Sequence, residues 1–173
     1  MKFDIYEWKT EEERISVRYR DHLDFQVPTD RVLVNALKLT TRRIGDITPR
    51  VEDLTVEKIF NSGLLSRSHI IDVGSDNPHQ FEFSVFSETP TVSGGTNHAF
   101  KLLGEYPGAM IRDWAMVDFP SVKREAVPLV STVNAVLAGR SVEYNRLVIP
   151  MSLDGRVVSH LFVSFTENLI QVD

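Results

Sequence analysis

Residues 144–165 read YNRLVIPMSLDGRVVSHLFVSF, and the fold is easiest to predict from this stretch. Two runs rich in β-branched and aromatic residues flank Asp154 and Gly155, a pair that readily takes the positive φ angles of a tight hairpin turn. With these two residues at the centre of the turn, the expected cross-strand pairs are Leu147 with Phe162, Ile149 with His160, Val148 with Leu161, and Tyr144 with Phe165. Both faces of this hairpin are apolar, so it needs cover on both sides. Pro150 has no N–H to donate and should therefore lie at an edge or a bulge.

Length and composition indicate one globular domain with an N-terminal extension. The chain has 173 residues, of which 42% are apolar, and a formal net charge of −5. This acidic balance argues against a nucleic-acid binder, because phosphate binding depends on clustered Lys and Arg. The lack of cysteine excludes disulfides, thiolate zinc sites and cysteine nucleophiles. The sequence has no signal-peptide pattern and no run near the roughly 18 apolar residues of a membrane span, so we expect a soluble cytoplasmic protein.

Hydrophobic spacing and turn residues predict the elements upstream of the hairpin. In chain order we expect a short strand around 15–19, a helix at 31–44, a short helix at 53–60, strands at 68–73 and 80–86, short helices over 98–119, and a long helix at 121–138. Pro128 should kink the long helix, because proline removes one backbone hydrogen bond and clashes with the preceding turn. The tail at 168–173 is a candidate for one more strand.

The hairpin and the helix before it resemble the last part of PAS domains, especially the short single-domain PAS proteins of bacteria. The resemblance rests on the pattern Tyr-x-Arg-Leu-x-x-Pro-x-Ser-x-Asp-Gly at 144–155 and on the order strand, strand, short helices, long helix, hairpin. A Pro-Arg linker at 48–53 extends it upstream. It implies an α+β fold in which a PAS-like antiparallel sheet is flanked by short helices and one long helix. Residues 1–64 would form an N-terminal helical extension, and 65–173 the PAS-like core.

No catalytic pattern stands out, and we expect a protein that is not an enzyme. The five histidines include no pair four residues apart on a predicted helix, so a helical zinc-hydrolase arrangement is absent. Gly94-Gly95-Thr96 lacks the Gly-Lys-Ser/Thr ending of a phosphate loop, and a turn with a helix cap explains it better. The carboxylates Asp113, Asp118 and Glu125 could lie near a cavity, but carboxylates at the beginning of a helix usually act as caps and as partners of the helix dipole.

The resemblance also bears on cofactors. Haem-binding PAS sensors commonly take their ligand histidine from the long helix, and light-sensing relatives use a flavin bonded to cysteine. The predicted long helix contains no histidine and the chain contains no cysteine. We therefore expect no cofactor, although His98 could approach a haem from the short helices.

In a PAS fold the short helices and the inner face of the sheet enclose a small space. The residues that we expect to line a ligand site there are Trp114, Tyr106, Arg112, Phe100, Met110 and Arg146, with Phe119 as a further apolar wall. Apolar walls with a few polar groups are typical of small-molecule sites. The alternative is that these side chains simply fill the core. Trp114 and Tyr106 favour the ligand site most, because each carries a polar group that needs a partner.

The function that we expect is a sensory or regulatory PAS-type module of bacterial signalling, which binds a small molecule, a protein partner, or both. A homodimer is expected as well, with the striped helix at 31–44 as a contact through Leu33 and Leu37, because large apolar surfaces usually mark partners. The alternatives are a small cone-shaped binding protein or enzyme of the nuclear-transport-factor-like type, and a purely structural dimerisation domain. Neither nucleic acid nor membrane is an expected partner.

Overall fold

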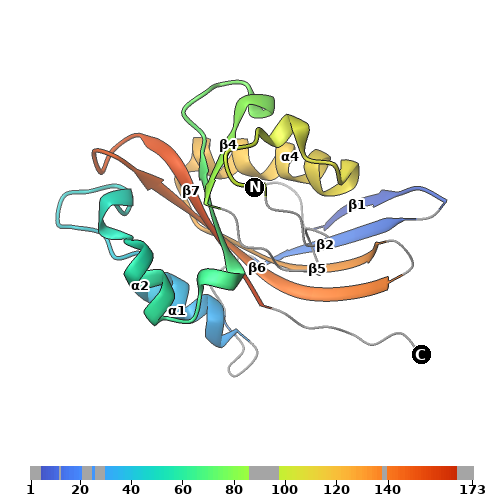
Figure 1. Cartoon of the computed structure of the whole chain (residues 1–173), viewed down its shortest axis with the longest axis horizontal. Coiled ribbons are helices and arrows are strands. Elements are labelled where there is room, and N and C mark those ends of the chain that lie inside the picture. The colour runs from blue at the N-terminus through green and yellow to red at the C-terminus, as the bar shows by residue number, and fades with distance from the viewer. Residues whose placement is uncertain are drawn as a thin grey trace.

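A computed structural model describes residues 5–11, 13–20, 25, 30–85, 98–137 and 140–166 of the chain. The fold is α+β, with seven strands in one antiparallel sheet (Figure 1). The strands are β1 (Ile5–Lys9), β2 (Arg14–Arg20), β3 (Ser68–Asp72), β4 (Glu82–Val85), β5 (Leu129–Leu137), β6 (Arg140–Ser152) and β7 (Val158–Phe165), in the sheet order β1-β2-β5-β6-β7-β3-β4. The helices are α1 (Arg31–Leu39), α2 (Val56–Asn61) and α4 (Ala109–Glu125), with short 3-10 turns at Val51–Asp53, Leu65–Arg67, Pro78–Gln80 and Leu103–Glu105.

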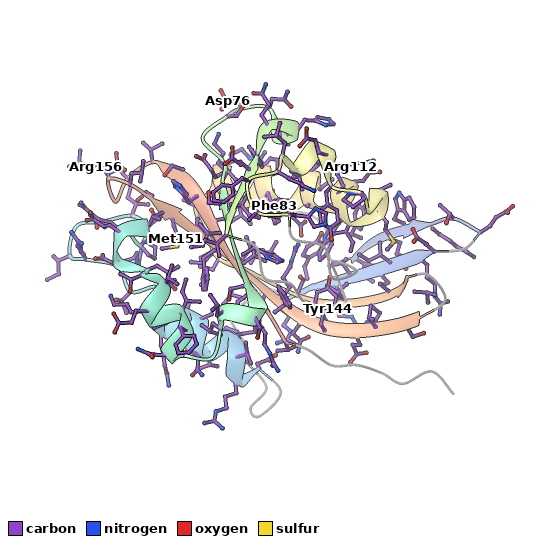
Figure 2. All side chains as sticks on the ribbon, in the orientation of Figure 1. Asp76, Phe83, Arg112, Tyr144, Met151 and Arg156 are labelled. Atoms are coloured by element: carbon purple, nitrogen blue, oxygen red, sulfur yellow. The ribbon has the colours of Figure 1, made fainter. Side chains whose placement is uncertain are left out.

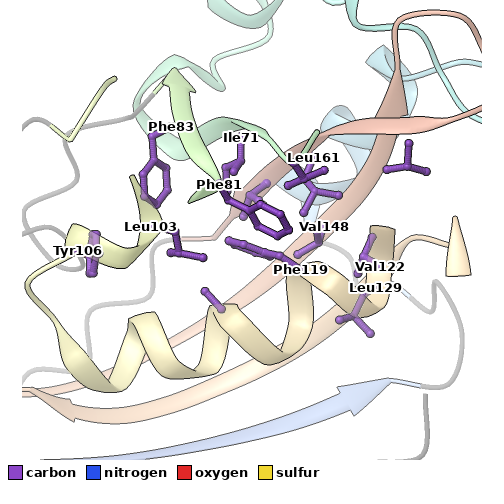
Figure 3. Packing of buried hydrophobic residues seen from close by; sticks show 14 residues of the cluster. Ile71, Phe81, Phe83, Leu103, Tyr106, Phe119, Val122, Leu129, Val148 and Leu161 are labelled. Atoms are coloured by element: carbon purple, nitrogen blue, oxygen red, sulfur yellow. The ribbon is translucent and has the colours of Figure 1, made fainter. Parts of the chain in front are cut away.

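Helices cover both faces of the sheet, as the two apolar faces of the C-terminal hairpin require. On one face α4 contributes Phe119 and Val122 to a cluster with Val148 of β6 and Leu161 of β7 (Figure 3). On the other face α1 and α2 pack against the neighbouring side chains of the same strands, and this cluster contains Leu33, Ala36, Ile59, Leu147, Ile149 and Phe162. Successive residues of a strand point to opposite faces, so one hairpin supplies both cores.

The hairpin of β6 and β7 forms as predicted, but its register differs by two residues. Ile149 pairs with Phe162 rather than with His160, because the connection spans 153–157 instead of two residues. A shift of two leaves every side chain on its expected face. Gly155 has the expected positive φ of +81°, and a Cβ atom there would lie 2.1 Å from a carboxylate oxygen of Asp46.

Pro150 lies where the missing N–H costs little. The pairing of β6 with β5 ends at Val148, so Pro150 lies beyond the last β5 partner, and a register irregularity follows between Met151 and Ser152. The expectation of an edge or a bulge is confirmed.

The prediction of a long helix at 121–138 is wrong. One helix, α4, runs from 109 through Pro120 to Glu125, and Ala126 ends it with a φ of +53°. Residues 129–137 then form strand β5, so Pro128 precedes a strand and kinks no helix. The segment LVSTVNAVL is rich in β-branched residues, and its apolar spacing fits either period. Pairing with β2 on one side and β6 on the other selects the strand.

The N-terminal helical extension is not seen. Strands β1 and β2 pair with each other, and β2 pairs with β5, so the first described residues belong to the sheet. The alternation around 15–19 predicted β2 correctly. The predicted helix at 31–44 ends earlier, as α1, and its apolar stripe packs on the chain's own sheet: Leu33 is fully buried and Leu37 lies against the same cluster. Leu33 therefore cannot be an exposed dimer contact.

Most of the remaining short elements agree with the sequence, but the short helices expected over 98–119 are a 3-10 turn at Leu103–Glu105 and the first part of α4. The predicted strands at 68–73 and 80–86 appear as β3 and β4, which pair antiparallel. Helix α2 begins after Thr55, whose side chain accepts a hydrogen bond from the Lys58 amide, and Gly63 follows its end with a φ of +69°. The candidate strand at 168–173 lies outside the described residues. No helix in the described part of the chain is long and apolar enough to cross a membrane.

Candidate functional site

A partly open cavity of about 50 Å³ lies between α4 and the sheet, and most of the residues that line it are buried. Its lining residues are mostly aromatic or aliphatic: His69, Phe83, Leu103, Tyr106, Ile111, Trp114, Ala115, Phe119, Tyr144, Arg146, Val163 and Phe165. Figure 2 labels two of them, Phe83 on β4 and Tyr144 on β6. A wider groove of about 340 Å³ lies over β1, β2, β5 and β6, but exposed charged residues such as Glu7 and Arg14 line it. The cavity beside α4, which is lined mostly by buried residues, is the better candidate for a selective site.

Arg146 is the polar centre of this cavity. It lies on β6, a central strand, and is only 5% exposed. Its guanidinium lies 3.6 Å from the centroid of the Trp114 ring, the geometry of a cation–π contact, and one of its terminal nitrogens forms an ion pair with Asp118. Its Nε–H is also buried and finds no hydrogen-bond partner among the described residues. A buried arginine therefore lines the cavity, and one of its buried donors has no partner in the described part of the chain.

Asp118 connects this arginine to the N-terminal hairpin. Its carboxylate is fully buried on α4 and accepts a hydrogen bond of 2.7 Å from the Tyr19 hydroxyl of β2. The Trp114 indole N–H donates to the same hydroxyl oxygen at 3.2 Å. Burial, and then the charge of Asp118, raise the pKa of Tyr19, so its hydroxyl stays protonated and can keep donating. Tyr19, which is 99 positions away from Asp118 in the sequence, thus helps to fix the wall of the cavity.

A second buried polar network lies on the opposite face of the sheet. Arg20 donates to Asp30 at 2.7 Å, and the Asn145 side-chain amide donates to the other oxygen of Asp30, also at 2.7 Å. Asn145 in turn accepts a hydrogen bond of 2.8 Å from the Thr132 hydroxyl. Asp30 immediately precedes α1, so this network fixes the start of that helix to β2, β5 and β6. Its side chain caps no helix amide, contrary to the usual role of aspartate at that position.

Two histidines lie close to the cavity without forming a metal site. His69 is buried between Phe83 and Phe165, whose ring centroids are 5.9 and 5.2 Å away, and burial lowers its pKa to about 3. His98 packs on Tyr106 at 4.8 Å, and burial lowers its pKa as well. Both rings are therefore neutral at physiological pH. No group of three or more metal-ligating side chains occurs among the residues with described positions.

The structure brings together half of the residues predicted for the site. Trp114, Tyr106 and Arg146 line the cavity, as does Phe119. Met110 is buried in a neighbouring cluster with Ile15 and Val17 of β2.

Arg112 and Phe100 lie away from the cavity. Arg112, labelled on α4 in Figure 2, donates through its guanidinium to the Tyr106 carbonyl at 3.1 Å. Phe100 is 77% exposed and has a φ of +64°. Gly94-Gly95-Thr96 lies outside the described residues.

Several residues of the site were not predicted from the sequence. His69, Tyr144 and Phe165 lie on β3, β6 and β7, and the alternation of side chains along these strands places them on the face that α4 covers. Recognising residues 129–137 as a strand, and α4 as the helix before it, would have identified that face. Tyr19 offers no such signal, because its role depends on β2 pairing with β5 next to β6. Asp118 was considered as a cavity carboxylate, and its partnership with Arg146 is visible only in the fold.

The site has the features of a binding site more than those of a reaction centre: apolar walls, one buried cation and a neutralising carboxylate. Among the described residues we see no nucleophile beside a base in it. Comparison with known proteins adds no further guide to function: no family model, no curated protein and no solved structure matches this chain.

Proposed function

We propose that this chain is a sensory or regulatory module of the PAS type that binds a small molecule in bacterial signalling. The order of its elements supports this assignment: β3 and β4, then short turns and the long helix α4, then β5 and the β6–β7 hairpin. The cavity lies between α4 and the sheet, where the PAS resemblance predicts a ligand. The strands β1 and β2 add to the sheet beyond β5 and are a feature of this chain.

The observation that carries the proposal is the buried Arg146, whose Nε–H has no hydrogen-bond partner within the described residues. A buried polar group without a partner costs roughly 1–3 kcal/mol, and more when it is charged. A core selected only for stability would hold an aliphatic side chain at this position, since apolar replacements of buried ion pairs are often neutral or stabilising. A ligand that accepts a hydrogen bond from Arg146 would account together for the buried arginine, the aromatic walls and the cavity.

A route for the signal follows from neighbouring residues on two strands. On β2, Tyr19 contacts Asp118 on the cavity side of the sheet, and the next residue, Arg20, contacts Asp30 on the opposite side. On β6, Arg146 likewise contacts Asp118, and its neighbour Asn145 contacts Asp30. A ligand that moves Arg146 relative to Asp118 therefore displaces β2, and with it the contact of Arg20 to the start of α1. We expect this shift in population to change the surface offered to a protein partner.

A thermal-shift screen of metabolites on two matched variants tests the proposal. Ala115→Leu adds three carbon atoms inside the cavity, because Ala115 lines it, whereas Val117→Leu places a leucine on the exposed side of α4. We expect at least one metabolite to raise the melting temperature of the wild type and of Val117→Leu but not of Ala115→Leu. Hydrogen exchange with that metabolite should then change protection in β2. If no metabolite acts, or if every shift survives in Ala115→Leu, the cavity is not a ligand site.

The expected signalling partner and homodimer remain part of the proposal, with a contact other than Leu33. Exposed apolar side chains occur on α2, where Val56 and Phe60 lie one turn apart. An analysis of oligomeric state with Phe60→Glu would show whether they lie in a contact between copies.

A further inference from the structure

Strand β1 is the only open edge of the sheet in the part of the chain that the structure describes (Figure 1). It pairs with β2 on one side, over five residue pairs without a register shift. The other edge strand, β4, is covered, because Phe83 donates to the Lys101 carbonyl at 3.1 Å and accepts from the Phe100 amide at 2.6 Å. β1 has no such cover, and it contains neither a proline nor a bulge, which are common ways to protect an edge.

The hydrogen bonds of the N-terminal hairpin indicate which backbone groups of β1 point outward. The Thr10 amide donates to the Glu13 carbonyl at 2.8 Å, so this pair closes the hairpin. In an antiparallel pair, residues alternate between those that bond to the neighbouring strand and those that do not. The even-numbered residues of β1 therefore bond to β2. The N–H and C=O groups of Ile5, Glu7 and Lys9 point toward the open side.

The side chains of β1 differ between the two faces of the sheet. On the face that α4 covers, Tyr6 and Trp8 are half-buried and pack against a cluster that includes Trp114. On the opposite face Glu7 and Lys9 are exposed, and neither forms an ion pair within the described residues. The edge thus carries an aromatic row on one face and two opposite charges on the other.

These charges determine how a second copy of the edge can pair with the first. A symmetric antiparallel ladder centred on Glu7 would place two glutamates opposite each other, and one centred on Lys9 would oppose two lysines. A ladder centred on Trp8 places Glu7 of each copy opposite Lys9 of the other. Opposite charges directly across a ladder stabilise it, and like charges destabilise it. Of the ladders centred on residues 6–9, only the one at Trp8 pairs opposite charges.

We propose that two copies of this chain join through their β1 edges, in an antiparallel ladder centred on Trp8 that makes one continuous sheet. This contact rests on the homodimer of the proposed function and does not depend on a ligand. The outward backbone groups of Glu7 and Lys9 bond to those of the second copy. The two Trp8 residues meet at the symmetry axis, where the Cα atoms of such a pair are about 4.5 Å apart. Both copies use the same surface, so the assembly closes as a dimer.

Charge reversal in the whole chain tests the contact. Glu7→Lys opposes lysines at both charged pairs and Lys9→Glu opposes glutamates, so the dissociation constant of each variant's dimer in sedimentation should rise at least about 10-fold, the equivalent of about 1.4 kcal/mol. An equimolar mixture of the two variants pairs the lysines of one with the glutamates of the other and should restore the dimer. The matched control is Glu143→Lys, which reverses a charge in the same cross-strand row but on β6, and it should leave the dimer unchanged.

Cysteine substitution locates the symmetry axis. The chain has no cysteine, so Trp8→Cys introduces a single thiol at the axis. The expected Cα separation there suits a disulfide, and oxidised glutathione, which takes up the two electrons, should cross-link this variant into a covalent dimer. Tyr6→Cys would place the two thiols four residues apart along the ladder, roughly 13 Å, and should remain a monomer on a denaturing, non-reducing gel.

Four results would overturn the contact: a wild type that sediments as a monomer at the highest concentration tested, an equal loss of dimer in Glu143→Lys, no recovery in the mixture, or a cross-link in Tyr6→Cys but not in Trp8→Cys. If the wild type is a dimer that the β1 variants do not dissociate, the contact is wrong and the homodimer of the proposed function stands. If the wild type is a monomer, both fail, and the open edge is left to a strand of another protein. Neither result touches the ligand test of the cavity.

Discussion

Replacement of Asp118 by alanine should destabilise the protein more than the loss of any surface ion pair. The change removes the only described anion on the Arg146 guanidinium and the acceptor of the Tyr19 hydroxyl. Arg146 would remain as an uncompensated charge in a place only 5% exposed. Breaking one side of a buried pair costs about 3–5 kcal/mol, and for a chain of this length that lowers the melting temperature by roughly 6–20 °C.

Two comparisons separate this effect from a general sensitivity of α4. Asp76→Ala breaks the Lys123–Asp76 pair of 3.1 Å, in which the aspartate is fully exposed, and should cost no more than about 1 kcal/mol. The double variant Asp118→Ala with Arg146→Met removes both charges, so it should be more stable than Asp118→Ala alone. Urea unfolding followed by circular dichroism gives the four free energies of the cycle.

The outcome that would refute this reasoning is equally definite. If Asp118→Ala costs no more than Asp76→Ala, the buried pair does not hold α4 to the sheet. If the double variant loses the sum of the two single losses, Arg146 and Asp118 act independently. Either result would also remove the proposed route from the cavity to β2.

Further predictions concern pH, the cavity, colour and assembly. The free energy of unfolding should fall by up to about 1.4 kcal/mol per pH unit as the pH drops from about 6.5 toward 3. In this range the histidine of the unfolded chain binds a proton, whereas buried His69 does not, because its pKa is lowered to about 3. His69→Phe should therefore flatten the pH dependence of urea unfolding. Trp114→Phe keeps most of the apolar volume but loses the indole N–H that donates to Tyr19, so it should weaken ligand binding more than it weakens folding. If the variant melts several degrees lower yet keeps every ligand-induced rise in melting temperature, Trp114 is only a core residue. The protein should purify without a haem or flavin absorption band, even from a haem-replete culture. Light scattering should give the mass of a dimer, and a monomer would contradict the expected assembly.

The sequence alone determined the features that depend on neighbouring residues. The positive φ of Gly155, the apolar faces of the hairpin and the short helix α2 all follow from local spacing and backbone preferences. The requirement for cover on both faces also followed from the sequence, because apolar and polar side chains do not alternate regularly along β7 and both of its faces carry apolar residues. Arg146 and Trp114 were recognised from their chemistry, as a charge and an indole within apolar stretches.

Only the tertiary structure decided the rest. Residues 129–137 carry apolar spacing compatible with a helix, and neighbours on both sides made them a strand. The register of the hairpin depended on a connection that docks against residues 46–48, where the Gly155 carbonyl accepts from the Ile47 amide. The polar networks join Tyr19 to Asp118 and Asp30 to Asn145, pairs 99 and 115 residues apart. No local pattern encodes such contacts, because an aspartate near a helix can equally cap it or neutralise a buried arginine, and the packing of distant strands selects between the two.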